Sequence, residues 1–170
     1  NQLKMPGGLT DSLFNASPKI STRARNWIRS PWNIVTAYVN YTPTENTTIS
    51  LKTTYLFSHR SLVCRNEDGG PGALDEINPA TNAFVHREVG NEDMHNATTE
   101  LRVSQNYTVR NQKSTLAGGI RYAYAWFKRQ GGGEGTVNSD FDLSITGDWG
   151  YDLDFVTTNI APFVENIFRV

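Results

Sequence analysis

Apolar and polar residues alternate along about five stretches of this chain. Two-residue alternation is typical of β-strands that have one apolar and one polar face. The pattern predicts strands over about 32–42, 47–64, 97–109, 114–128 and 155–170. The second stretch has about 18 residues, whereas strands of soluble proteins usually have about 5 or 6. A tilted strand needs only about 9–11 residues to cross a membrane, so the surplus would extend beyond the bilayer.

The stretch 114–128 has the sharpest alternation. One face collects large apolar residues, namely Leu116, Ile120, Tyr122, Tyr124 and Trp126. The other collects small residues and one cation, namely Ala117, Gly119, Arg121, Ala123 and Ala125. A dry sandwich core would not normally hold Arg121, whereas a wet barrel lumen accepts it. We therefore predict that the large side chains face lipid and Arg121 faces the lumen, the alternative being an aromatic cross-strand ladder in a soluble sheet.

The links between the strands are of two kinds. Short polar links are expected at 43–46 and 110–113, and long loops rich in Gly, Asp and Asn at about 66–96 and 130–154. Short turns on one side and long loops on the other are typical of outer-membrane barrels. The predicted fold class is therefore all-β, an antiparallel transmembrane β-barrel segment with its turns in the periplasm and its loops outside. Because such barrels start at eight strands, the missing strands would lie outside the given sequence.

Composition narrows the function classes. Hydrophobic residues make up 38% and charged residues 19% of the chain, and no stretch approaches the roughly 18 apolar residues of a spanning helix. The net charge of −1 gives no indication of nucleic-acid binding. The single cysteine, Cys64, excludes an internal disulfide. No catalytic constellation stands out, so we predict no enzyme activity.

Outside the strands, few residues suggest specific structure or chemistry. Residues 1–31 are expected to form a loop with a short helical turn near 10–14, capped by Thr10 and Asp11. The three histidines, His59, His86 and His95, have no metal-ligand spacing, so we predict no metal site and no resident cofactor.

Six segments together resemble a known family. They are 5–11, 21–27, 65–71, 115–122, 139–143 and 157–169. In this order they resemble the barrel region of TonB-dependent outer-membrane receptors, specifically the ferric-citrate (iron dicitrate) transporter group. The resemblance implies a 22-stranded barrel with an N-terminal plug, uptake of a ferric chelate, and location in the bacterial outer membrane. Residues 1–170 would be a central part of the barrel domain, without the plug, the TonB box or a signal peptide.

The expected cargo suggests which side chains bind it. Ferric citrate is anionic, and the planar fork of arginine binds carboxylates bidentately. We predict an external ligand site formed by Arg65, Arg87, Arg129 and Gln130, the alternative being solvated arginines paired with nearby carboxylates. A second set is expected to face the lumen and the plug: Glu100, Arg102, Arg121, Glu165 and Arg169.

The implied partners follow from this family assignment. They are the ferric chelate, outer-membrane lipid, and the protein's own plug domain and the TonB complex, reached through parts absent from this chain; nucleic acid is not among them. Iron would arrive only as part of the transported chelate. The competing hypothesis is a soluble, secreted all-β binding module, a lectin- or adhesin-like sandwich. Solubility without detergent would favour that module.

Overall fold

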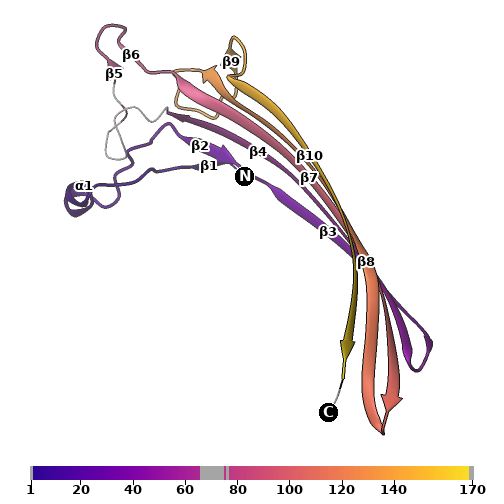
Figure 1. Cartoon of the computed structure of the whole chain (residues 1–170). Coiled ribbons are helices and arrows are strands. Elements are labelled where there is room, and N and C mark those ends of the chain that lie inside the picture. Colours follow the sequence, from indigo (N-terminus) through magenta and orange to yellow (C-terminus); the bar gives the residue numbers. More distant parts are fainter. Residues whose placement is uncertain (1, 66–74, 76, 169–170) are drawn as a thin grey trace. The chain divides into compact units, whose positions relative to one another are not determined.

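The chain forms an antiparallel β-sheet protein. The computed structural model describes residues 2–65, 75 and 77–168, with 69% strand and 4% helix. The main sheet has eight strands in the order β1-β2-β4-β7-β8-β10, with β3 also paired to β4 and β9 to β8 (Figure 1). The elements are β1 (Gln2–Lys4), α1 (Asp11–Ala16), β2 (Trp27–Arg29), β3 (Trp32–Thr44), β4 (Thr47–Arg65), β5 (Ile77–Asn78), β6 (Ala83–Phe84), β7 (Arg87–Val109), β8 (Gln112–Gly135), β9 (Ile145–Thr146) and β10 (Tyr151–Ile167). The all-β prediction is confirmed.

The five predicted strands correspond to β3, β4, β7, β8 and β10, but several are longer than expected. β7 begins at Arg87, β8 continues to Gly135 and β10 begins at Tyr151. The predicted loops, 66–96 and 130–154, were therefore drawn too long, because their ends belong to strands. Alternation fails there, since polar residues and glycines occupy both faces. Strand pairing nevertheless continues, because the ladder uses backbone groups that every residue except proline supplies.

The two predicted short links are confirmed as tight turns. Glu45 and Asn46 separate β3 from β4, and Arg110 and Asn111 separate β7 from β8. Arg110 and Asn111 both have positive φ, 49° and 60°. Positive φ at both central residues is the mark of a type I′ turn, whose twist matches that of the flanking strands.

The chain divides into two compact units, and the long strands β4, β7, β8 and β10 contribute to both. The first unit comprises 1–31, 58–93 and 128–154. Here α1 begins as predicted: Thr10 Oγ1 accepts a hydrogen bond from the Leu13 N–H at 3.4 Å. β1 pairs with β2, and β2 pairs with β4, with Trp27 opposite Val63. These two short strands were not predicted, because three residues are too few to show alternation.

The second unit comprises 32–57, 94–127 and 155–170. Most of its large apolar side chains are exposed, and none of those that the structure describes is buried. The buried apolar residues of the whole described chain are only Val63, Val89 and Ala117. A sheet that packs against a second layer would bury far more apolar area. Across the described residues, no helix is long and apolar enough to span a membrane.

Candidate functional site

The sheet of the second unit has two chemically different faces. A polar cavity of about 370 Å³ is lined by Lys52, Thr54, Thr98, Glu100 and Arg121. An apolar cavity of about 160 Å³ is lined by Thr99, Leu101, Ile120, Tyr122 and Ile160. Arg121 and Tyr122 are neighbours in one strand, and so are Glu100 and Leu101, so the two cavities lie on opposite faces. The predicted alternation in β7 and β8 is confirmed at these positions.

Charged side chains cross-link the polar face. Arg102 Nη1 lies 3.0 Å from Glu165 Oε1, and Arg102 Nε lies 3.4 Å from Glu100 Oε1. The Arg102 guanidinium also lies over the Phe163 ring, 5.0 Å from its centroid. Glu100, Arg102 and Glu165 therefore share one face, as expected, although a lumen or plug contact stays a prediction. The expectation for Arg169 lies outside the described residues.

The apolar face remains open to its surroundings. Eight of its large side chains in the three central strands are each 39–45% exposed, namely Leu51, Tyr55, Phe57, Leu101, Val103, Leu116, Ile120 and Tyr122. A ring cluster lies on the same face: Tyr55 Oη is 2.6 Å from His95 Nδ1, and His95 packs against Trp126 with centroids 5.2 Å apart.

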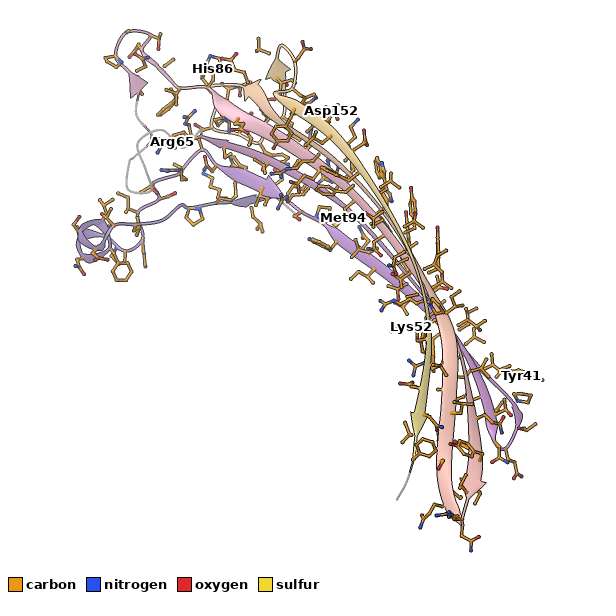
Figure 2. All side chains as sticks on the ribbon, in the orientation of Figure 1. Tyr41, Lys52, Arg65, His86, Met94 and Asp152 are labelled. Carbon is orange, nitrogen blue, oxygen red and sulfur yellow. The ribbon has the colours of Figure 1, made fainter. Side chains whose placement is uncertain are left out.

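In the first unit, Arg65 and Arg87 are buried rather than presented to a ligand. Arg65, at the end of β4 (Figure 2), and Arg25 both contact Asp75, with N–O distances of 3.7 and 3.3 Å. Arg87 is 1% exposed and donates to the carbonyl oxygens of Arg25, Thr136 and Asp140 at 2.9, 3.2 and 2.7 Å. Burial lowers the pKa of Arg87, and the nearby Arg25 charge lowers it further. These arginines connect segments that are far apart in sequence.

Arg129 has a more open setting. Its Nε lies 3.1 Å from Glu92 Oε1, and the same carboxylate oxygen contacts Arg60 Nη2. The side chains of Arg60 and Arg129 are 41% and 49% exposed, whereas that of Glu92 is only 10% exposed. The Arg129 guanidinium also lies over the Tyr151 ring, 5.5 Å from its centroid. The buried carboxylate thus holds two half-exposed arginine side chains beside each other.

Gln130 points away from Arg129. Its amide donates to Asp152 Oδ2 at 2.7 Å, and Lys128 Nζ contacts the same carboxylate at 3.4 Å. Consecutive residues of a strand face opposite sides, and β8 continues through both positions. The structure therefore does not bring the four predicted ligand residues together. Glu92 was missed because it falls in the stretch of β7 that shows no alternation and was expected to be loop.

A serine, a histidine and an aspartate form one further series of hydrogen bonds. His59 Nδ1 lies 2.6 Å from Asp93 Oδ1, and His59 Nε2 lies 2.8 Å from Ser61 Oγ. The order of atoms is that of a hydrolase triad, which the sequence did not reveal because Asp93 lies on another strand. Ser61 is only 1% exposed, so its hydroxyl cannot reach a substrate. We interpret this series of hydrogen bonds as a polar link between β4 and β7.

Within the described ranges, no group of three or more His, Cys, Asp or Glu side chains is placed to hold a metal ion. No protein-family model, no curated protein and no solved structure matches this chain.

Proposed function

We propose that this chain is part of the wall of an outer-membrane β-barrel of the TonB-dependent receptor type, which takes up a ferric chelate, with ferric citrate as the expected cargo. The observation that carries the proposal is the two-faced sheet of the second unit, which has an exposed apolar face and a polar face. Contiguous exposed apolar patches on soluble monomers are rarely larger than a few hundred Å². In a membrane barrel the apolar face meets lipid and the polar face meets the aqueous lumen.

The outer strands of the sheet support a larger assembly. Within the described sheet, β3 pairs only with β4, and β10 is the last strand of the order. Their outward backbone groups would each cost several kcal/mol if left unpaired in lipid. Further strands would therefore have to continue the wall on both sides. The plug domain and the TonB complex would act through parts of the protein outside these residues.

Collision accessibility of spin labels tests the membrane assignment. After Cys64→Ser, single cysteines at positions 120, 121 and 122 would carry a nitroxide in the protein reconstituted into phospholipid vesicles. We expect labels at 120 and 122 to collide mainly with oxygen, which partitions into lipid, and the label at 121 to collide mainly with a water-soluble nickel chelate. Equal accessibility at all three positions, or a protein soluble without detergent, would favour the secreted binding module instead.

For the cargo, we assign the capture site to Arg129 together with Arg60. Both side chains are half-exposed, and each guanidinium group keeps N–H donors beyond those that contact Glu92. Such donors suit the carboxylates of citrate, and each charge-assisted contact contributes roughly 1.5–3 kcal/mol. Arg65 and Arg87 are reached by a ligand only if the segments around them move, and Gln130 lies on the opposite face. No resident cofactor is needed, because the iron is cargo.

Binding of ferric citrate to the full-length receptor tests this site. We expect Arg129→Ala and Arg60→Ala each to weaken binding by about ten- to a hundredfold. Lys128→Ala is the matched control, because Lys128 is the preceding residue of the same strand and faces the other side. If both arginine variants bind like the parent receptor, the capture site lies elsewhere.

A further inference from the structure

We propose that the polar cavity of the second unit is a separate binding site for a small polycarboxylate or phosphate anion. Its lining comes from three adjacent strands, with Lys52 and Thr54 on β4, Thr98 and Glu100 on β7, and Arg121 on β8. Figure 2 labels the position of Lys52 on β4. This site requires only that the polar face is open to water. It is distinct from the site at Arg60 and Arg129 that we propose captures the chelate.

The charges of the lining favour an anion. Among the described residues, Lys52 and Arg121 make no hydrogen bond and no ion pair. Glu100 is the one acidic residue of the lining, and its carboxylate contacts Arg102 at 3.4 Å. Two cations of the cavity are thus without a counter-ion, while its carboxylate already has one.

The donors and the size define the ligand class. An ammonium group, a guanidinium group and two threonine hydroxyls together offer many donors and few acceptors. A cavity of about 370 Å³ falls within the usual size range of small-molecule sites. A di- or tricarboxylate or a phosphate can contact the ammonium and the guanidinium group at once, with charge-assisted hydrogen bonds to both. A neutral sugar or an apolar ligand would leave both cations uncompensated.

Protection of a lysine from acetylation tests the site directly, with citrate and inorganic phosphate as probes. The full chain in detergent micelles would be treated with a limiting amount of an amine-acetylating reagent, and acetylation at each lysine would be measured by mass spectrometry. At citrate ten times its dissociation constant, we expect acetylation of Lys52 to slow about tenfold. Lys113, an exposed lysine of β8, should be unaffected. Sodium chloride at the same ionic strength separates binding from simple screening.

Variants test whether Arg121 is the second cation that binds the anion. Arg121→Gln should weaken the protection of Lys52 by citrate about tenfold or more, whereas Arg110→Gln, in the turn between β7 and β8, should not change it. Equal slowing at Lys52 and Lys113, or no slowing at either, would overturn the proposal. The proposal would also be overturned if Lys52 did not react before citrate is added, because another protein segment would then cover the cavity. None of these readouts depends on uptake or on Arg129, so failure of the proposed function would leave them informative.

Discussion

Replacing Arg87 by methionine separates a structural role for this residue from a ligand role. The guanidinium donates to three carbonyl oxygens, those of Arg25, Thr136 and Asp140, and to the Thr136 hydroxyl. Methionine fills similar space but donates nothing. The Thr136 carbonyl keeps a hydrogen bond from the Arg87 backbone N–H at 3.4 Å, so two carbonyls, those of Arg25 and Asp140, lose their partner. A buried carbonyl left without a partner costs about 1–3 kcal/mol, so the two together cost at least about 2 kcal/mol if they stay dry. The Asp140 carboxylate adds little, because it is 3.9 Å away and 71% exposed.

Hydrogen exchange followed by mass spectrometry measures the local stability that Arg87→Met loses, in the segments where the loss should occur. Local opening that becomes easier by about 2 kcal/mol speeds exchange by about thirtyfold. We expect this acceleration in peptides covering 22–27 and 136–140, the segments that Arg87 connects. Arg129→Met is the control, because Arg129 is half-exposed and contacts neither segment in the described structure. If Arg87→Met changes exchange by less than about twofold but abolishes binding of ferric citrate, Arg87 is a ligand residue and the structural reasoning is wrong.

Two further predictions concern a glycine and a carboxylate. A Cβ on Gly119 would overlap the Leu101 carbonyl oxygen and lie 2.7 Å from Phe163 Cζ, so Gly119→Ala should destabilise by about 1–3 kcal/mol in denaturant unfolding. Gly118→Ala, whose nearest contact would be 3.6 Å, should stay within about 0.5 kcal/mol, and equal effects would refute the packing argument. The backbone N–H of Ser144 donates to Asp142 at 2.9 Å and holds the pKa of that carboxyl below its ordinary value of 3.8. The stability that this carboxylate contributes is therefore present above its unfolded pKa and is lost as pH falls through the folded pKa; a carboxyl ¹³C titration that gives 3.8 or more would contradict this.

The strands and their faces could be predicted because the signal is local. In a strand the side-chain direction reverses at every residue, so alternation alone assigns Arg121 and Tyr122 to opposite faces. The tight turn at Arg110 and Asn111 was also recognised from its short polar composition. Prediction of the strand ends failed where glycines and polar residues interrupt the alternation, because backbone pairing continues without any side-chain pattern.

The candidate site was predictable only as a set of residue types. Arginines near the ends of strands can be found in the sequence, but their burial depends on segments far away in the chain. Arg87 is closed in by Arg25 and by residues near 136–140, while Arg129 remains half-exposed beside Glu92. The contact between His59, Ser61 and Asp93 likewise depends on how β4 lies against β7.

The sequence by itself therefore determined the all-β class, the main strands and the two-faced character of the sheet, since each follows from a period of two residues. The tertiary structure decided which arginines are accessible, which carboxylate each one contacts, and which cations of the polar face remain without a counter-ion. Those properties depend on distances between residues of different strands and loops, and the register and packing that set such distances leave no local trace in the sequence.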